Sequence, residues 1–591
     1  MLGKVTRINE NLSISVKCWD DKIVESIEPI PCTQTKHPLK LGDTISFRYK
    51  LMQKKSFGVR QRIIVVDSIN IIEPIKDEVL NSCFEDIAYN WKVDASNEDD
   101  KYFYITENAK QILSGRRCFV IGRKGSGKTA IRRYLVTEAK KDPLHFIKSL
   151  SFDNFPFNDL LPYSESNIAH KRQYFLFWKY VILSSIAQMM LENNALSTHV
   201  YNELYPLFGQ SLKDTLSNNI KTWTGDIFSF NALIKHLNIA GNINRNYTKN
   251  ESTLEDKVDI LQKYIDKNMG ENFKYSIVFD ELDDGYADTS QREEYNSLLT
   301  SLFRAVNDVK EKFEHSNSII QPVIFLRDDI YSQLEDTNTN KWTDWIINLN
   351  WRIPEILKML THRISISCGG LESLSPDTLF AYISSLEHMS ELNKEGKSEK
   401  CNILRYIENR TLYRPRDFIT WFIELAKNCI NHNNNVIKYI TVLAAESEVS
   451  KRMHTEFENE LYGSKKIKYP KIAFDLLGII QKKTFDSEEL KIFYDYFDIE
   501  GILSISADDF LAHLFKFSII GYIGNNNKHI FSFNNPRSEL LSANPIVVNA
   551  SLHRVLEVAD SKYKPITDLD ALRIRSMLES KYSNLLFYSK L

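Results

Sequence analysis

The stretch IGRKGSGKTA, residues 121–130, decides how the middle of this 591-residue chain folds. A short apolar run, RRCFVI at 116–121, precedes it and predicts a buried β-strand. The following TAIRRYLVTEAKK carries apolar residues at helical spacing until Asp142 and Pro143 end the pattern. A strand, a glycine-rich loop and a helix in this order indicate an α/β core, in which a parallel sheet is flanked by helices.

The glycine-rich loop has the spacing of a phosphate cradle, G-x-x-x-x-G-K-[ST]. Glycines allow successive backbone N–H groups to turn inward around phosphate oxygens, and the following helix adds its positive end. We expect Lys128 to reach the β- and γ-phosphates and Thr129 to ligate Mg²⁺. A plain turn is the alternative, which the flanking strand and helix disfavour. The residues expected to contact the nucleotide, ATP, are Gly122, Gly125, Ser126, Gly127, Lys128, Thr129 and Ala130.

An acidic pair stands in the downstream stretch KYSIVFDELDDGY, residues 274–286. Residues 276–279 form an apolar run that predicts a buried parallel strand. Asp280 and Glu281 come at its carboxyl end, where open α/β sheets bind their ligands. We expect Asp280 to hold Mg²⁺ and Glu281 to orient and deprotonate the attacking water. The pair therefore favours ATP hydrolysis over passive binding.

Further charges follow this strand. Asp283 and Asp284 are either an outer part of the metal site or a solvated turn, and we favour the turn. A helix expected at 291–313 leads into another strand, which ends at Arg327 in FLRDDIY. AAA-type and related ATPases carry a polar or charged residue close to the γ-phosphate at this place, and similarity to them implies that role for Arg327. Asp329 is spaced to anchor Arg327 through a bidentate pair, for which guanidinium and carboxylate are geometrically matched. An ordinary surface ion pair is the alternative.

From about residue 351 the pattern is helical, which predicts a helical lid over 351–450. In TLYRPRDFITWF, Pro415 and Asp417 mark the start of one of its helices. Arg414 and Arg416 flank the proline. In ATPases with a helical lid an arginine or a proline at this place senses the nucleotide, and similarity to them implies that one of the two arginines contacts phosphate. The alternative for Arg416 is that it only packs the lid.

Residues 1–75 predict a small β-barrel of the OB or cold-shock type, because short β-rich runs alternate with turn signals. The segment 48–62 is basic and lacks acidic residues, and Trp19, Tyr49 and Phe57 offer stacking faces for single-stranded nucleic acid. A solvated sheet edge and a protein-docking module are the alternatives.

Residues 451–591 are expected to hold a winged-helix-like domain and a tail. Within 470–556, three helical stretches precede IIGYI, the turn formers GNNNK and HIFSF, which predict a hairpin. Winged helices read DNA or contact proteins, and no helix here is conspicuously basic.

Composition excludes several classes of protein. The chain is 43% hydrophobic, and its 75 basic and 77 acidic residues nearly cancel, as in ordinary globular proteins. Its 7 cysteines are never spaced C-x-x-C, which argues against a zinc site and favours a reducing, cytoplasmic setting. The N-terminus lacks the features of a signal peptide. Lys179 interrupts the apolar stretch at 174–191, so we expect a buried helix there and no membrane partner.

These motifs, in this order, resemble a bacterial family of large P-loop ATPases allied to the AAA+ and STAND (signal-transduction ATPases with numerous domains) group. Such proteins are often found in phage-defence and mobile-element loci. The resemblance covers about residues 77–556 and leaves the barrel outside. It rests on FVIGRKGSGKTAI, SLSFDNFPFNDL, VFDELDDGY, FLRDDIYSQLEDTNTNKWTDWIINLNW, RPRDFI and LFKFSIIGYI. It implies nucleotide-binding roles for Gly122, Gly125, Gly127, Lys128, Thr129, Asp280 and Glu281, and less directly for Arg327 and Arg414 or Arg416.

The expected division of the chain is a barrel at 1–75, an ATPase core at 76–350 with a helical insertion at about 150–265, the lid, and the C-terminal domain. The expected catalytic residues are Glu281, Arg327 and Arg416, whereas Arg414 is expected to bind nucleotide.

The leading hypothesis is a Mg²⁺-dependent ATPase that works as a switch or motor in phage defence or nucleic-acid metabolism. We expect a homo-oligomer or an effector protein as its partner. The alternatives are an origin-recognition-like, DNA-loading AAA+ ATPase and a scaffold that binds nucleotide without hydrolysing it.

Overall fold

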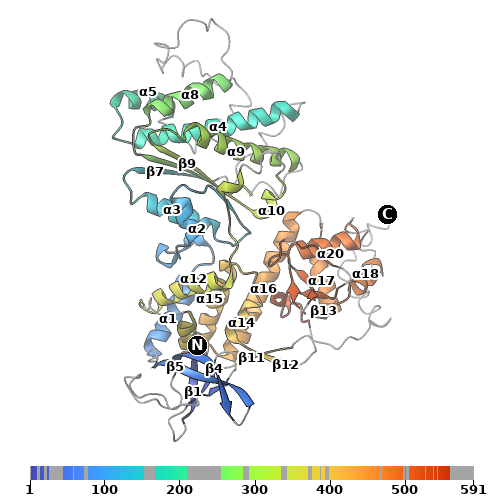
Figure 1. The fold of residues 1–591 in the computed structure, drawn as a ribbon. Coiled ribbons are helices and arrows are strands. Elements are labelled where there is room, and N and C mark those ends of the chain that lie inside the picture. The colour runs from blue at the N-terminus through green and yellow to red at the C-terminus, as the bar shows by residue number, and fades with distance from the viewer. Residues whose placement is uncertain are drawn as a thin grey trace, which may run out of the picture. The chain divides into compact units, whose positions relative to one another are not determined.

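The computed structural model divides into two units, whose elements Figure 1 shows. The core unit is Ile105–Asn350, and the flanking unit is Met1–Tyr104 together with Trp351–Leu591. The structure describes residues 2–8, 14–18, 23–25, 44–56, 59–71, 77–151, 167–208, 254–283, 292–334, 342–370, 376–385, 388–392, 398–464, 467, 469–496, 500, 503, 505–525, 528–536, 538–541 and 544–558.

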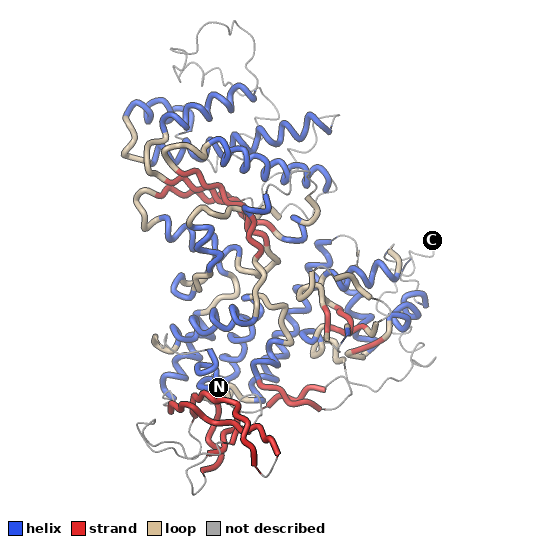
Figure 2. The backbone as a smooth tube through the Cα atoms, in the orientation of Figure 1, coloured by secondary structure: helices blue, strands red, loops and turns tan. Residues whose placement is uncertain are grey.

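A parallel five-stranded sheet forms the centre of the core unit (Figure 2). Its strands lie in the order β10-β6-β9-β8-β7, and every pairing is parallel. The expected α/β core with a parallel sheet is therefore confirmed. The strands are β6 (Phe119–Ile121), β7 (His145–Ser151), β8 (Lys274–Asp280), β9 (Ile319–Leu326) and β10 (Ile346–Asn348).

Helices cover both faces of this sheet (Figure 1), so its central strands are apolar on both sides. In β8 every residue from 275 to 280 is buried. One face carries α2 (Glu107–Leu113) and α3 (Lys128–Ala139). The other carries α4 (Asn167–Glu192), α5 (Thr198–Phe208), α8 (Leu254–Asn268) and α9 (Arg292–Lys312), of which α4, α5 and α8 lie in the expected helical insertion.

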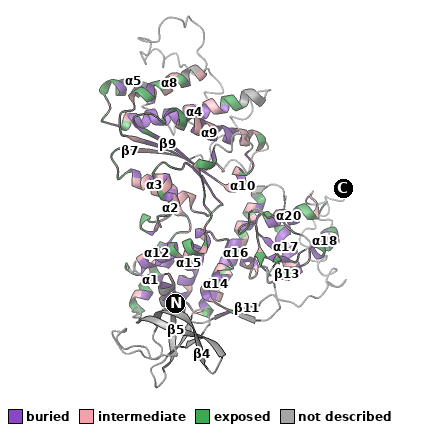
Figure 3. Cartoon of the chain, in the orientation of Figure 1, coloured by how far each residue is buried: buried purple, intermediate pink, exposed green. Residues whose placement is uncertain are grey.

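Helix α4 contains the stretch that a membrane span would also explain. Its segment Lys171–Glu192 is long and apolar enough to cross a bilayer, but 78% of its most apolar window is buried (Figure 3). The indole N–H of Trp178, which is fully buried, donates to the Leu298 carbonyl at 2.9 Å. The Lys179 ammonium lies 2.9 Å from the Asp308 carboxylate, which neutralises a charge that is almost fully buried. Helix α4 is therefore a core helix, as expected.

Proline occupies the middle of central strand β9, although it has no N–H to donate to a ladder. The Ile324 N–H donates to Cys118 on the β6 side at 2.8 Å, and alternation along the strand puts the Pro322 nitrogen on that same side. The pairing of β6 with β9 begins only at Ile324, so Pro322 precedes it and no ladder bond is lost.

The flanking unit builds a helical cluster from two distant parts of the chain. α1 (Asp77–Asn90) packs its apolar face against α12 (Ile353–Ser367) and α15 (Pro415–Asn431). Residues 77–104 therefore belong with the expected lid, and the core begins at Ile105 rather than near residue 76. The P-loop motif marks a core, but it carries no information about which partner an upstream helix has.

Two features of this cluster differ from the sequence expectation. Helix α16 (Tyr439–Ser464) runs without a break across residue 450, so the expected boundary there falls inside a helix. The second concerns KCNILRYIENR, residues 400–410, which lies in the region where the pattern is helical from about residue 351. Instead β11 (His388–Leu392) and β12 (Ser398–Asn402) form a hairpin, and the Asn402 side chain caps the N-terminus of α14 (Ile403–Glu408) by accepting the Arg405 N–H at 2.8 Å.

The C-terminal part of the flanking unit contains the expected helices and hairpin. Its sheet order, β13-β16-β14-β15, includes two short strands that the sequence pattern did not indicate, β13 and β16. The winged-helix assignment stays a prediction. The elements are α17 (Pro470–Ile480), β13 (Thr484–Phe485), α18 (Ser487–Tyr496), α20 (Ala507–Lys516), β14 (Ile520–Ile523), β15 (His529–Ile530) and β16 (Ile546–Val548), with α13 (Pro376–Ile383) earlier in the unit.

The N-terminal strands form an antiparallel sheet in the order β3-β2-β1-β4-β5. Among the described strand residues no pairing joins β3 to β5, which would close the sheet, so the barrel stays a prediction. Of the three expected stacking residues, Tyr49 lies in β4, and Trp19 and Phe57 lie outside the described residues. The strands are β1 (Leu2–Ile8), β2 (Ile14–Cys18), β3 (Ile23–Glu25), β4 (Thr44–Ser56) and β5 (Val59–Ile71).

Replacing Arg363 by Leu is expected to loosen the segment that follows α1. The Arg363 guanidinium, only 3% exposed, donates to both carboxylate oxygens of Glu98 and lies 4.4 Å from the Trp91 ring. Without it the Glu98 carboxylate, only 11% exposed, keeps the Lys92 N–H but loses its charged partner, which costs up to about 3–5 kcal/mol. Hydrogen exchange over residues 91–104 should speed up accordingly. Lys358→Leu, at an exposed position of the same helix, is the control, and equal exchange in both variants would contradict the expectation.

Candidate nucleotide-binding site

The loop between β6 and α3 needs its glycines for two different reasons. Gly125 and Gly127 have φ angles of 81° and 95°, a region that residues with side chains rarely adopt. A Cβ at Gly122 would lie 2.5 Å from the Ser126 hydroxyl oxygen and 2.9 Å from the Leu349 Cβ. Gly125 and Gly127 are therefore required by the backbone conformation. Gly122 is required because a side chain there would collide with Ser126 and Leu349. The remaining expected contacts, Thr129 and Ala130, lie in the first turn of α3.

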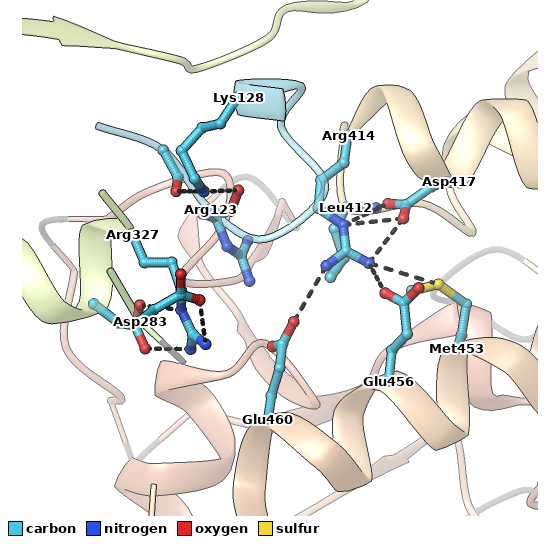
Figure 4. Close-up of polar contacts among 12 residues, drawn as sticks. Arg123, Lys128, Asp283, Arg327, Leu412, Arg414, Asp417, Met453, Glu456 and Glu460 are labelled. Atoms are coloured by element: carbon cyan, nitrogen blue, oxygen red, sulfur yellow. Dashed lines mark hydrogen bonds and ion pairs between the residues drawn. The ribbon is translucent and has the colours of Figure 1, made fainter. Parts of the chain in front are cut away.

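Lys128 spans the loop that it follows. Its ammonium donates to the carbonyl oxygens of Gly122 at 2.7 Å and of Arg123 at 3.1 Å (Figure 4). Burial lowers the pKa of this ammonium, and the nearby Asp283 carboxylate opposes that shift. A desolvated cation that is held only by neutral carbonyls binds an anionic oxygen more strongly than its present partners.

Asp280 ends β8 and is only 4% exposed. Burial raises the pKa of its carboxyl group, and the guanidinium of Arg132 acts in the opposite direction. Arg132 belongs to α3, and its Nε lies 2.9 Å from the Asp280 Oδ2. The Arg132 Nη1 also donates to the Ser149 hydroxyl of β7 at 3.4 Å. The expected metal ligand thus has a cationic partner that the sequence analysis did not identify.

Glu281 has a strained backbone. Its φ is 61°, in the left-handed region that a residue other than glycine adopts at a cost. The next residue, Leu282, is fully buried, and its carbonyl accepts a hydrogen bond from the Tyr295 hydroxyl at 2.6 Å. Packing of that neighbour fixes the turn, so the Glu281 side chain leaves the strand in one defined direction.

Arg327 follows β9 directly and makes the bidentate pair that its spacing suggested. Its Nε and Nη2 donate to the two Asp329 carboxylate oxygens at 2.9 and 2.6 Å, and its Nη1 donates to Asp283 at 3.4 Å (Figure 4). Asp283 lies in a turn with its side chain 36% exposed, and it also joins the ion-pair network of Arg327. Asp284 lies outside the described residues.

Asp328 adds a carboxylate that the sequence analysis left out. Burial raises the pKa of this carboxyl group. The guanidinium of Arg123 opposes that shift most strongly, and the ammonium of Lys128 opposes it less. Arg123 therefore acts within the core unit, on a residue just beyond β9. Lys124, its neighbour in the loop, is exposed.

In the flanking unit, Arg414 joins two helices. Its guanidinium, 3% exposed, donates to Asp417 of α15 at 2.8 Å and to Glu456 and Glu460 of α16 at 2.8 and 3.3 Å (Figure 4). These contacts give Arg414 a structural role between α15 and α16. Arg416 is half-buried in the first turn of α15. Contact of either arginine with a phosphate stays a prediction.

The core unit therefore gathers charges around Lys128. Three carboxylates act to raise the pKa of the Lys128 ammonium, and one guanidinium acts to lower it. The carboxylates are Asp283, Asp328 and Asp280, the guanidinium is that of Arg327, and all four come from the ends of β8 and β9. The signal for Arg132 was present in the sequence, since it stands four residues after Lys128 and one helical turn brings both to one face.

The chemistry of the donor set fits a magnesium ion held together with phosphates. Mg²⁺ prefers hard oxygen ligands and is usually bound by one or two protein groups besides the phosphate oxygens. Asp280 provides a buried carboxylate, and Thr129 provides a hydroxyl in the first turn of α3. Among the described residues no cluster of three or more His, Cys, Asp or Glu side chains could hold a metal by itself.

Comparison with known proteins gives two sequence matches. Residues 354–458, in the flanking unit, match the family model of the FunZ-associated C-terminal helical domain. Over 366 residues the chain is 23% identical to the putative transposon gamma-delta 80.3 kDa protein of Escherichia coli (strain K12). That alignment covers 58% of this chain and 48% of the relative, so the chain spans about half the length of the curated relative that it matches.

Solved structures give weaker matches. Cdc6p from Pyrobaculum aerophilum is 11% identical with a TM-score of 0.28, over 82% of this chain and 98% of that one. The ORC2 protein of Aeropyrum pernix, in ADPNP–ADP complexes, is 12% identical with a TM-score of 0.34, over 79% and 91%. Similarity at these TM-scores carries no argument about this chain.

The strain at Glu281 predicts an unusual order of stability. Glu281→Gly should be more stable than Glu281→Ala by about 1 kcal/mol, because only glycine adopts the left-handed region without a steric penalty. Native-state hydrogen exchange of the β8 amides would measure the difference. The same two substitutions at Glu271, whose φ is not positive, should show no advantage for glycine. Equal stability of the two Glu281 variants would contradict the expectation.

Proposed function

We propose that this chain binds ATP with Mg²⁺ and hydrolyses it, and that it works as a switch or motor of AAA+ or STAND type. The observation that carries the proposal is Glu281, held at a φ of 61° directly after the buried Asp280. Strained backbone persists where surrounding packing enforces it and clusters at functional sites. A scaffold that only held nucleotide would gain nothing from a carboxylate carried on strained backbone at the carboxyl end of β8.

The loop residues would bind the phosphates. Backbone N–H groups of residues 125–129 would face phosphate oxygens at the positive end of α3. Lys128 would exchange its two carbonyl partners for the β- and γ-phosphates, since charge-assisted hydrogen bonds are stronger than those to neutral carbonyls.

The remaining side chains would bind the metal, accept a proton and stabilise charge on the γ-phosphate. Asp280 and Thr129 would hold Mg²⁺, which when bound draws negative charge from the phosphates. Glu281 would accept a proton from the attacking water. Arg327, oriented by its two bonds to Asp329, would stabilise charge on the γ-phosphate.

The biological setting is proposed on sequence grounds. The likeness to a transposon protein and the resemblance to ATPases of defence and mobile-element loci both support a role in phage defence or nucleic-acid metabolism. In this proposal the N-terminal sheet binds single-stranded nucleic acid through the basic segment 48–62. An origin-recognition-like, DNA-loading activity is the alternative.

Two substitutions test the ATPase. Glu281→Gln should retain ATP binding and lower kcat by about 10²–10⁴-fold, because it removes the base and leaves the cradle intact. Lys128→Ala should abolish binding of both ATP and ADP. Steady-state phosphate release and equilibrium titration of a fluorescent nucleotide would measure these effects.

Matched controls come from exposed positions. Glu271→Gln precedes β8, and Lys140→Ala stands at the far end of the helix that Lys128 begins. Both should behave as the unsubstituted chain. Binding without turnover in the unsubstituted chain would favour the scaffold, and turnover unaffected by either site substitution would overturn the assignment.

Nucleic-acid binding is tested through its salt dependence. Lys54 and Lys55 lie near the turn of the β4–β5 hairpin, opposite Gln61 and Arg60. If both contact phosphates of single-stranded DNA, Lys54→Ala/Lys55→Ala should reduce the slope of log K against log salt concentration by about 1.4. Fluorescence anisotropy with a labelled oligothymidine at several salt concentrations would measure it. An unchanged slope would remove this hairpin from the binding surface.

A further inference from the structure

The pair formed by Arg132 and Asp280 joins helix α3, which follows the glycine-rich loop, to the carboxyl end of strand β8. Asp280 is the expected metal ligand, yet its Oδ2 lies 2.9 Å from the Arg132 Nε and its side chain is only 6% exposed. The Arg132 side chain is 19% exposed, so water screens this pair little. None of the roles proposed above uses this arginine.

The position of Arg132 is fixed by the fold. It stands one turn after Lys128 on α3, so both cations lie on one face of the helix that starts at the loop. Its hydrogen bond to Ser149 ties the same guanidinium to β7, the neighbour of β8. Two strands and one helix therefore hold Arg132 against Asp280.

A buried carboxylate needs a compensating charge, because an unpaired ion away from water is strongly destabilising. Arg132 supplies that charge at one oxygen of Asp280. A divalent cation at the same carboxylate would compete with the guanidinium, since two cations around one carboxylate repel each other at short range.

We propose that Arg132 is a counter-ion that Mg²⁺ displaces from Asp280, so that the site takes the metal with nucleotide phosphates and not alone. The phosphates supply both the additional oxygen ligands of Mg²⁺ and a new anionic partner for the released guanidinium. Free Mg²⁺ supplies neither and leaves the pair closed. The inference rests on the proposed ATP site and makes Arg132 a positioning residue within it.

The test compares the response of each variant to MgCl₂ without nucleotide. In the unsubstituted 591-residue chain, millimolar MgCl₂ should leave the unfolding temperature of the core unit unchanged relative to EDTA. Arg132→Gln should lower that temperature in EDTA, because Asp280 loses its partner, and MgCl₂ should now restore it. The apparent affinity for free Mg²⁺ should rise by about tenfold or more, the size of a typical coupling between two ligands.

Three variants serve as references. Arg132→Lys keeps a cation near Asp280 and should fall between the unsubstituted chain and Arg132→Gln. Arg133→Gln changes the adjacent residue of α3 and should behave as the unsubstituted chain. Arg132→Gln combined with Asp280→Asn should lose the response to Mg²⁺, because the carboxylate itself is gone.

The outcomes separate this inference from the proposed function. An Arg132→Gln variant that unfolds cooperatively and responds to Mg²⁺ no more than the unsubstituted chain overturns the exchange. The ATP site is judged by a different measurement, the ratio of ADP affinities with and without Mg²⁺. If Asp280→Asn leaves that ratio unchanged, the metal assignment fails, and the exchange fails with it. Arg132→Lys supplies the same comparison if Arg132→Gln does not fold.

Discussion

The parallel pairing of β6 with β9 is the constraint on which the site depends. In this pairing Ile121 lies opposite Leu326, so the two strands end level with each other. The Gly122 N–H then donates to the Leu326 carbonyl at 3.2 Å, and the phosphate loop begins beside Arg327. Strand β8 pairs with the other side of β9 and brings Asp280 to the same edge. A loop after one strand and carboxylates after two others become one site only because all these strands run in the same direction.

The cations at that edge already have partners within the core unit. Arg132 pairs with Asp280, Arg327 pairs with Asp329 and Asp283, and Lys128 is bonded to carbonyls. In the proposed site a polyanion would therefore meet cations that already have partners. Its binding energy would come from exchanging these partners and not from filling an open positive field. Such exchange would make affinity depend on which groups the ligand offers, so that a triphosphate with its metal would be distinguished from a simple anion.

Sequence alone predicted the sheet and the loop because their signals are local. Glycines at fixed spacing, an apolar run and an acidic pair at its end each occupy a short window. The partners of these groups were harder to foresee. That Arg132 meets Asp280 depends on how α3 lies across β7 and β8, and the pattern of α3 alone does not contain that information. Arg414 shows the converse, since its motif suggested a phosphate sensor and its contacts are carboxylates of α15 and α16.

The two compact units differ from the expected domain boundaries for the same physical reason. Residues 77–104 precede the P-loop in the chain and were assigned to its domain, yet their buried apolar side chains face α12 and α15. An amphipathic pattern states that a helix has a partner and leaves the partner's identity open. Helix α16 crosses residue 450, where the lid was expected to end, because no helix stop occurs there.

The exit of the chain from the core unit lies against the phosphate loop. Leu349, one residue before the unit ends at Asn350, donates its N–H to the Ile121 carbonyl at 2.8 Å. Its side chain occupies the space that a Cβ at Gly122 would need. Toward the opposite end of β9, by contrast, the Gln321 side-chain amide donates a hydrogen bond to the Ile112 carbonyl of α2. Close packing transmits small displacements instead of absorbing them. A loop that changes shape around phosphates would therefore move the exit of the chain before it moved α2, and this gives a nucleotide-driven switch its mechanical starting point.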